Sequence, residues 1–296
     1  MKTRPLLVGI GEILWDMLPG GKQLGGAPAN FAYQANALGG RGVVVSRVGD
    51  DDLGREILAR LDTCNVDRRF VLIDPDHPTG TVDVRVDQRG IPEYVIHQNV
   101  AWDHLEMTPD VSALAPTIDC VCYGTLAQRG ETSRDTIAAF LKSTRSDCLR
   151  VFDINLRQNF YSASLIENLL SVSRVLKLND AELPVVGELL NLGDSEREII
   201  DNLFRRFDLI AIALTRGPQG SAIFTPDRVY EQPAPEVQIA DTVGAGDAFT
   251  AAIALGICAG VEMGKIGELA TRVAAFVCTQ HGAMPSMPAD LRIIPR

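Results

Sequence analysis

The feature that most constrains this chain is a regular alternation of short apolar runs with segments of helical periodicity. Apolar runs of five or six residues are typical of strands buried on both faces, and strands separated by helices pair in parallel. We therefore predict an α/β fold with helices on both faces of a mostly parallel sheet. The predicted strands are Leu6–Gly11, Val43–Val48, Ile118–Tyr123, Leu149–Ile154, Arg174–Leu178 and Leu209–Leu214. The predicted helices are Pro28–Leu38, Leu53–Leu61, Ser133–Lys142, Leu165–Leu170, Ala181–Leu190, Glu196–Phe204, Ala245–Ala259 and Ile266–Gln280.

One early region departs from this alternation. Residues Thr79–Val86 and Glu93–His97 alternate polar and apolar side chains on either side of a turn at 87–90, which predicts an antiparallel hairpin with one solvated face. The segment Ile13–Leu18 is a candidate third strand of the same small sheet. Such a sheet is either a lid over a ligand or a surface hairpin without a role.

Charge and hydropathy exclude several classes of protein. The chain of 296 residues carries a net charge of −10 without a basic cluster, which argues against nucleic acid as a partner. No apolar run approaches the roughly 20 residues that span a bilayer, and none resembles a signal peptide, so we expect a cytoplasmic protein. The six cysteines show neither a CxxC pair nor zinc-binding spacing, and we expect them to be reduced.

The segment Asp241-Thr-Val-Gly-Ala-Gly-Asp247 carries the strongest chemical signal. Small residues at the start of a helix let an anion approach unpaired backbone N–H groups, so Gly244, Ala245 and Gly246 form a candidate phosphate site. Asp247 would repel a bound phosphate, and this cost is understandable if its carboxylate takes a proton from an attacking hydroxyl. The alternative is that Asp247 only stabilises the first turn of the helix.

Two other nucleotide motifs are missing or incomplete. The sequence contains no GxxxxGK[ST] segment, so it is not a P-loop enzyme. Gly9-Ile-Gly11 begins like a dinucleotide fingerprint, but Leu14 occupies the position of the third glycine. A dinucleotide oxidoreductase is therefore disfavoured.

Two segments resemble the signatures of the ribokinase/PfkB family of carbohydrate kinases. Asp241–Asp247 is similar to the C-terminal signature, and the Gly25-Gly-Ala-Pro-Ala-Asn segment that continues to Gly40 is similar to the N-terminal one. The segments Val48–Gly54 and Thr215–Gly220 also resemble family blocks, so the likeness covers the whole chain. The resemblance implies a three-layer α/β/α sandwich, one domain over residues 1–296, with a lid formed by about 13–25 and 79–100. It also implies that Asp247 is the catalytic base, ATP the phosphate donor and Mg²⁺ a cofactor.

The resemblance assigns sugar contacts to several positions. Asp16 matches an aspartate that binds sugar hydroxyls, and Gly25, Gly26 and Asn30 match further sugar contacts. Carboxylate and amide groups can bind hydroxyls directionally, while glycines admit close approach of the backbone. Asn30 could otherwise be a polar residue at the start of a helix.

A second block, Asp153-Ile-Asn155-Leu-Arg157, follows a predicted strand, where ligands bind in open α/β sheets. Strand alternation predicts that its three polar side chains lie on one side. The block resembles fructokinases and 2-keto-3-deoxygluconate kinases, and Arg157 could contact sugar, neutralise phosphate or form a structural ion pair. His97 and Trp102 could face the sugar or only pack.

The nucleotide and cation contacts are also assigned by resemblance. Asn179 would lie near the phosphates, and Glu182 would order Mg²⁺ through water or, alternatively, only begin a helix. Thr215, Gly217 and Gly220 would approach ATP. A monovalent cation such as K⁺, which several members bind, would be held by the residues Asp241, Val243, Gly282 and Ser286.

The expected reaction is the phosphorylation of D-fructose to fructose 6-phosphate by a homodimer that pairs through its lid sheets. The alternatives are a kinase of the same family for 2-keto-3-deoxygluconate, ribose or a nucleoside. A non-catalytic sugar or nucleotide sensor on the same scaffold is disfavoured because Asp247 is present.

Overall fold

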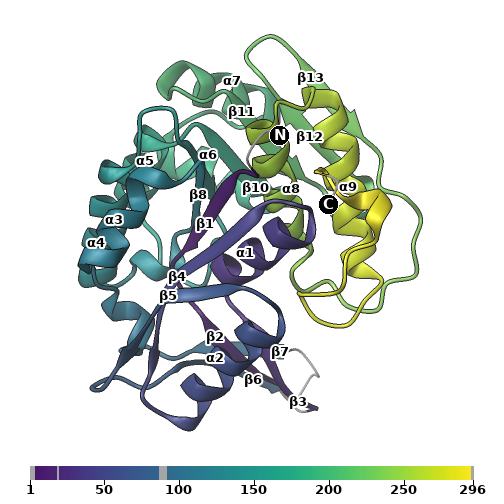
Figure 1. The fold of residues 1–296 in the computed structure, drawn as a ribbon. Helices are drawn as coiled ribbons and strands as arrows, with labels where there is room; N and C mark the ends of the chain where they lie inside the picture. Colours follow the sequence, from purple (N-terminus) through teal and green to yellow (C-terminus); the bar gives the residue numbers. More distant parts are fainter. Residues whose placement is uncertain (1–3, 19, 87–91, 295–296) are drawn as a thin grey trace.

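The computed structural model describes residues 4–18, 20–86 and 92–294, and it confirms the three-layer α/β/α arrangement (Figure 1). Within these residues the main sheet has nine strands, and neighbouring strands pair in parallel except in the last two pairs at one edge, which are antiparallel. The strands, in order across the sheet, are β13 (Val229–Gln232), β12 (Ser221–Phe224), β11 (Ala211–Thr215), β10 (Val175–Asn179), β9 (Leu149–Asp153), β8 (Cys120–Tyr123), β1 (Leu6–Ile10), β4 (Arg41–Gly49) and β5 (Asp67–Asp74).

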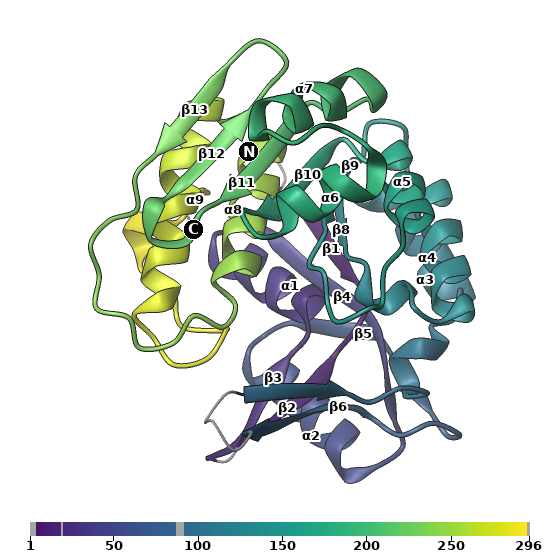
Figure 2. The same cartoon turned by 180° about the vertical axis from the view of Figure 1, so that it is seen from behind.

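Helices cover both faces of this sheet, as Figures 1 and 2 show from opposite sides. Leu7 of β1 packs into one apolar cluster and its neighbour Val8 into another, because successive side chains of a strand point to opposite faces. The first face carries α1 (Ala27–Ala37), α2 (Asp52–Thr63), α8 (Ala245–Ala259) and α9 (Met263–Cys278). The second face carries α3 (Pro109–Leu114), α4 (Glu131–Ser143), α5 (Ala163–Val172), α6 (Glu182–Leu190) and α7 (Glu196–Arg206).

Helix α1 lies unusually close to the sheet because glycines face it. A Cβ atom on Gly9 of β1 would lie 2.1 Å from the carbonyl oxygen of Pro28, and one on Gly42 of β4 would lie 1.8 Å from that of Ala32. Only glycine fits at both positions, so backbone contact fixes the distance between α1 and the sheet.

A second, smaller sheet lies beyond one end of the main sheet (Figure 1). Among the described residues it has four strands, in the order β3 (Gly21–Gly25), β2 (Leu14–Leu18), β6 (Gly80–Val86) and β7 (Pro92–Ile96). The expected antiparallel pairing of β6 with β7 is confirmed, and the candidate strand Ile13–Leu18 corresponds to β2. The predicted turn at 87–90 lies outside the described residues.

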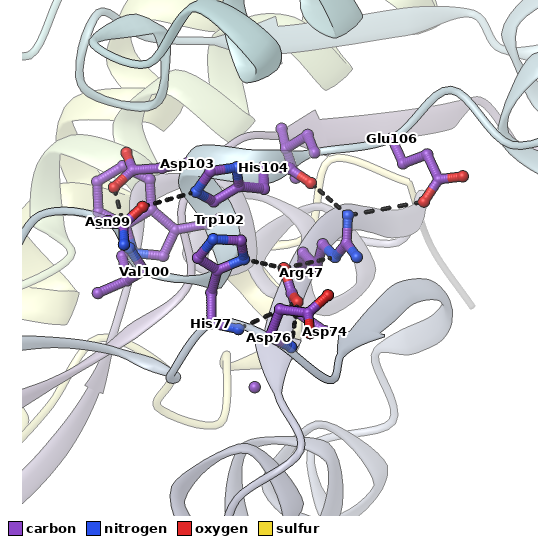
Figure 3. A network of polar contacts seen from close by, with 12 residues as sticks. Arg47, Asp74, Asp76, His77, Asn99, Val100, Trp102, Asp103, His104 and Glu106 are labelled. Carbon is purple, nitrogen blue, oxygen red and sulfur yellow. Dashed lines mark hydrogen bonds and ion pairs between the residues drawn. The ribbon is translucent and has the colours of Figure 1, made fainter.

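A network of polar side chains lies where the chain passes between the two sheets (Figure 3). Asp74, at the end of β5, forms an ion pair with Arg47 (3.1 Å between Oδ2 and Nε) and pairs with His77 Nδ1 (3.0 Å). The rings of His77 and His104 stack with centroids 3.6 Å apart, and Arg47 Nη1 donates to the His104 carbonyl at 2.6 Å. Because His77 precedes β6 and His104 follows β7, the network ties both linkers of the β6–β7 hairpin to β4. We call these four residues the hinge network.

Several elements were not expected from the sequence. Strands β5 and β13 lie at the two edges of the main sheet, and both mix charged with apolar residues. Strand β3 contains two glycines, and α3 is only six residues long. The six cysteines are free thiols, as expected. None of the described helices is long and apolar enough to cross a membrane.

Candidate active site

The predicted site residues gather at the edge of the main sheet where its parallel strands end. Glu12 follows β1, Asp153 ends β9, Asn179 ends β10 and Thr215 ends β11. Helices α1 and α8 both begin beside this edge and pack against each other. Ligands in open α/β sheets bind outside the carboxyl ends of the strands, so the topology itself marks this edge as the candidate site.

Asp247 lies in the first turn of α8, partly exposed at the centre of this edge. Its Oδ2 accepts a hydrogen bond of 2.8 Å from Asn30 Nδ2 on α1. Loss of solvation and the nearby charge of Asp153 raise its pKa to about 6, although Asn30, Lys177 and Arg157 oppose that rise. A carboxylate with such a pKa is still ionised at neutral pH and is a better proton acceptor than an ordinary aspartate.

The turn before Asp247 presents backbone donors. Gly244 has a φ of 78°, and a Cβ there would lie 2.3 Å from Ala283 Cβ, so the turn requires glycine. The N–H of Ala245 donates to the Thr242 carbonyl at 3.3 Å. The N–H groups of Gly244 and Gly246 have no protein acceptor in the part of the chain that the structure describes. Two of the three predicted donors are therefore open to an anion at the N-terminus of α8.

A buried ion pair lies beneath the N-terminus of α8. Lys177 Nζ of β10 contacts Asp153 Oδ1 at 3.0 Å, and Thr250 Oγ1 of α8 donates to Asp153 Oδ2 at 2.7 Å. A Cβ on Gly246 would lie 3.2 Å from Lys177 Nζ, so the ammonium group sits next to the anion-binding turn. Both charged side chains are buried, and each offsets the cost of desolvating the other. Asp153 thus holds Lys177 and α8 in place.

The Asp153–Arg157 block does not continue as a strand. Strand β9 ends at Asp153, and Asn155 has a φ of 43° in the left-handed region. The expected alternation that would put Asp153, Asn155 and Arg157 on one side is therefore wrong, because the chain turns after Asp153. Arg157 nevertheless lies close enough to lower the pKa values of Glu12, Asp16 and Asp247. Its positive charge therefore acts on the candidate site from the loop after β9.

On the expected sugar side, Asp16 of β2 and the glycines before α1 lie together. A Cβ on Gly25 would lie 2.4 Å from Asp16 Oδ2, so the glycine leaves room for the carboxylate. Burial raises the pKa of Asp16 to about 6. Gly26 is the N-cap of α1, and Asn30 follows one turn later with its Oδ1 buried and unpaired. An unpaired buried acceptor of this kind can accept a hydrogen bond from a ligand, such as a sugar hydroxyl.

His97 and Trp102 have different surroundings. His97 pairs with Asp83 on the smaller sheet (3.0 Å between Nε2 and Oδ2), and 45% of its side chain is exposed. Trp102 is fully buried, and the Arg129 guanidinium lies 4.0 Å from its ring centroid. Trp102 therefore packs in the core, and only His97 is accessible to a ligand.

On the expected nucleotide side, Asn179 and Glu182 organise the start of α6. Asn179 Oδ1 accepts from the N–H groups of Ala181 (2.9 Å) and Glu182 (2.8 Å). The two oxygens of Glu182 accept from the N–H groups of Leu156 and Asn179, each at 2.9 Å. Both carboxylate oxygens already hold backbone donors, so Glu182 fits a contact to a metal ion through water better than direct coordination.

Three further positions form the turn after β11. Thr215 ends the strand, Gly217 has a φ of 52°, and Gly220 has a φ of 95° with the carbonyl of Gln232 2.0 Å from where a Cβ would be. The turn exposes backbone groups beside the ends of β10 and β11. Its glycines have a conformational reason to be there, whether or not a nucleotide binds.

The expected cation residues are partly brought together. Asp241 accepts from the N–H groups of Val243 and Gly282, each at 3.0 Å, and so joins the loop before α8 to the loop after α9. Ser286 is exposed, and no contact with this group is recorded among the described residues. Those residues also contain no cluster of three His, Cys, Asp or Glu side chains suited to a metal ion.

The sequence reasoning missed Glu12, Lys177 and Thr250 as parts of the site. Glu12 and Lys177 each interrupt or follow an apolar strand, and a charged residue in such a run is the signal that could have identified them. Thr250 carries no such signal, because a threonine in a helix is ordinary.

Comparisons with known proteins identify the family of this chain. The model of the pfkB family of carbohydrate kinases matches residues 20–290. A Pyrococcus horikoshii protein described as an uncharacterized sugar kinase is 28% identical over 96% of this chain and 94% of its own length. The fructokinase of Klebsiella pneumoniae is 29% identical over 94% of this chain and 95% of its own.

Solved structures lead to the same fold. The P. horikoshii sugar kinase in complex with ATP superposes with a TM-score of 0.81 at 27% identity, over 96% of this chain and 95% of that one. The ribokinase of Arabidopsis thaliana shares the fold with a TM-score of 0.79 at 22% identity, over 99% of both chains. Since the family model and the relatives extend over nearly the whole sequence, this chain belongs to the pfkB family of carbohydrate kinases.

Proposed function

We propose that the protein transfers the γ-phosphoryl group of ATP to D-fructose and forms fructose 6-phosphate, with Asp247 as the general base. The observation that carries this proposal is the position of Asp247. Its carboxylate is held by Asn30, its pKa is raised to about 6, and it stands beside the open N–H groups at the start of α8. This arrangement supports the proposal, because a proton acceptor would lie next to the proposed anion site.

In the proposed reaction the hydroxyl oxygen of the sugar attacks the γ-phosphorus as Asp247 takes the hydroxyl proton. A new O–P bond forms, the bond between the γ-phosphorus and the bridging oxygen breaks, and ADP leaves with that oxygen. The N–H groups of Gly244 and Gly246 stabilise negative charge on the transferring group. Lys177, beneath Gly246, adds positive charge to the same place. Mg²⁺ bound with ATP neutralises phosphate charge, and Glu182 would contact it through water.

Asp16, Gly25, Gly26 and Asn30 would bind the sugar on the opposite side of Asp247. Asp16 and Asn30 offer acceptors for hydroxyls, and Arg157 holds a positive charge near both carboxylates. His97 would reach the same sugar from the smaller sheet when that sheet closes. Closure would exclude water, which would otherwise accept the phosphoryl group.

Fructose is favoured over other sugars by the fructokinase relatives and by the Asp153–Arg157 block. A coupled assay of ADP release with fructose, ribose, 2-keto-3-deoxygluconate and adenosine tests this choice. The expected outcome is the highest kcat/KM for fructose. Turnover on another member of the panel without turnover on fructose would contradict the substrate and leave the kinase chemistry standing.

The cation and the oligomer are further proposals. Oxygen donors from Asp241 and neighbouring carbonyls suit K⁺, so replacing K⁺ by tetramethylammonium should lower kcat.

Within the described residues β3 and β7 form the two edges of the smaller sheet, and pairing of such edges between two copies would cover them. Light scattering should then give twice the chain mass of 32.1 kDa. A monomer mass would exclude the dimer.

A further inference from the structure

Arg129 has a buried side chain to which no role has yet been given. It follows β8 and the short turn 126–128, so it belongs to the main-sheet side of the molecule, and only 6% of its side chain is exposed. Its Nε and Nη2 donate to Asp103 Oδ1 and Oδ2, each at 2.8 Å. A buried ion pair often contributes little net stability, because both groups lose their hydration, so stability alone does not explain this one.

The same guanidinium group reaches the hairpin of the smaller sheet. Its Nη2 also donates to the carbonyl of His97, the residue that follows β7. The N–H of His97 donates to the Thr81 carbonyl of β6 at 3.1 Å, and the His97 ring pairs with Asp83 Oδ2 of β6 at 3.0 Å. Arg129 therefore links the main-sheet side of the molecule to the end of the β6–β7 hairpin, at the residue predicted to contact the sugar.

Two aromatic rings pack against the guanidinium group. The Cζ atom of Arg129 lies 4.0 Å from the ring centroid of Trp102 and 4.8 Å from that of Phe160. Trp102 packs against the other end of the hairpin, since a Cβ on Gly80 of β6 would lie 2.1 Å from its Nε1. Phe160 lies in the loop after β9, and its N–H donates to the Arg157 carbonyl at 3.1 Å. Directly or through these rings, the guanidinium thus contacts both ends of the hairpin and the loop that carries Arg157.

This set of contacts depends on the planar fork of an arginine. Nε and Nη2 bind the two oxygens of one carboxylate, while Nη2 also reaches the His97 carbonyl. A lysine at this position would keep the positive charge beside Asp103, but it presents all its donors from one nitrogen and cannot reproduce these bonds. Because Nη1 has no partner among the described residues, the bonds of Nε and Nη2 fix how the guanidinium is oriented.

We propose that Arg129 is a positioning residue for the phosphoryl transfer, which holds the end of the β6–β7 hairpin so that His97 meets the sugar. Arg129 acts through His97 and contacts neither the sugar nor ATP. The inference rests on the proposed function, because it needs His97 to contact the sugar. It needs neither fructose as the substrate nor Asp247 as the base, so the experiment uses whichever sugar gives the highest kcat/KM in the panel of substrates.

Steady-state kinetics with sugar and ATP varied in turn tests this role. Arg129→Lys removes the fork and keeps the charge, so the KM for the sugar should rise by about tenfold and the KM for ATP by less than about twofold. His97→Ala should give a similar rise in the KM for the sugar. The double variant should be no worse than His97→Ala alone, because a residue that acts through His97 loses its effect when that side chain is absent. The exposed Arg134→Lys on α4 is the matched control and should keep the wild-type constants.

A purely structural role would give a different pattern. Additive effects of Arg129→Lys and His97→Ala, or equal rises in the KM values for sugar and ATP, would overturn the proposal. Asp103→Asn loosens the guanidinium without replacing it and should also raise the KM for the sugar, and an unchanged KM there would overturn the proposal even if Arg129→Lys does not fold. A rise confined to His97→Ala would refute the role of Arg129 alone. Absence of wild-type turnover on every sugar of the panel would refute the proposed function and this inference with it.

Discussion

The hinge network and the active-site pocket both concentrate charged side chains at low exposure, but they treat carboxyl groups in opposite ways. In the hinge network Asp74 forms an ion pair with Arg47 and accepts hydrogen bonds from His77 and two backbone N–H groups. Its pKa is lowered although it is only 1% exposed (Figure 3). In the pocket Glu12, Asp16 and Asp247 have few donors, and their pKa values are raised to about 7, 6 and 6.

The difference shows what each region is built for. A carboxylate with a full set of donors stabilises the fold at neutral pH, because the unfolded chain offers nothing comparable. A desolvated carboxylate with few donors costs stability but is ready to take a proton. A carboxylate with a full set of donors therefore lies where the two sheets join. Desolvated carboxyl groups with few donors lie where substrate would bind.

The largest expected effect comes from removing the proposed base, Asp247. Asp247→Asn keeps the size of the side chain but cannot take a proton, so kcat should fall by about 10²–10⁴. A steady-state assay at pH 8 measures this change. The exposed Asp135→Asn on α4 serves as control and should keep wild-type turnover. Near-normal turnover of Asp247→Asn would contradict the role of Asp247 as proton acceptor. The proposed difference between the candidate site and the hinge network would then have no functional basis.

A smaller effect is expected from the hinge network, and on stability. Asp74→Asn leaves Arg47 and His77 without their charged partner, so the free energy of unfolding should fall by about 2–4 kcal/mol. Urea denaturation measures it, and Asp76→Asn, two residues on and exposed, should change little. Because the pKa of Asp74 is lowered, its contribution is present at neutral pH and is lost as pH falls below about 4. A destabilisation that persisted unchanged at pH 3 would argue against this electrostatic account.

The smallest expected effect is the contribution of Asp247 to the pH dependence of folding stability. The raised pKa of Asp247 means that the folded state binds its proton more tightly than the unfolded state does. Wild-type stability should therefore decline as pH rises from about 4 through 6. Asp247→Asn removes this loss and should be more stable than wild type at pH 8 by on the order of 1 kcal/mol, with a smaller difference at pH 5. Thermal unfolding at the two pH values would reveal it, and a variant less stable at pH 8 would contradict it.

The sequence predicted those elements whose pattern of apolar residues matches their burial in the fold. The parallel strands from Leu6–Ile10 to Ala211–Thr215 read as apolar runs because both of their faces are buried. The edge strands β5 and β13 were missed because one side of an edge strand faces solvent and accepts charged residues. The same logic explains α3, whose six residues are too few for a helical period to stand out.

For the site, spacing predicted the glycine turn and Asp247 but not their surroundings. The alternation argument failed at Asn155 because the strand ends two residues earlier, which no periodic pattern reveals. Lys177 pairs with a residue distant in the sequence, Asp153, and such a pair becomes visible only when the strands are placed side by side. The glycine turn and its carboxylate could thus be predicted from the sequence, whereas the ion pair beside them could not.

The glycine contacts between α1 and the main sheet also restrict how this enzyme can be altered. A library that randomised β1, β4 and α1 together would recover many combinations of apolar side chains, since volume can be redistributed among them. Gly9 and Gly42 should survive in every active clone, because no compensating change elsewhere makes room for a Cβ against the backbone of Pro28 and Ala32. In directed evolution toward another sugar, the side chains around Asn30 should therefore tolerate substitution. The two glycines against which α1 packs should not.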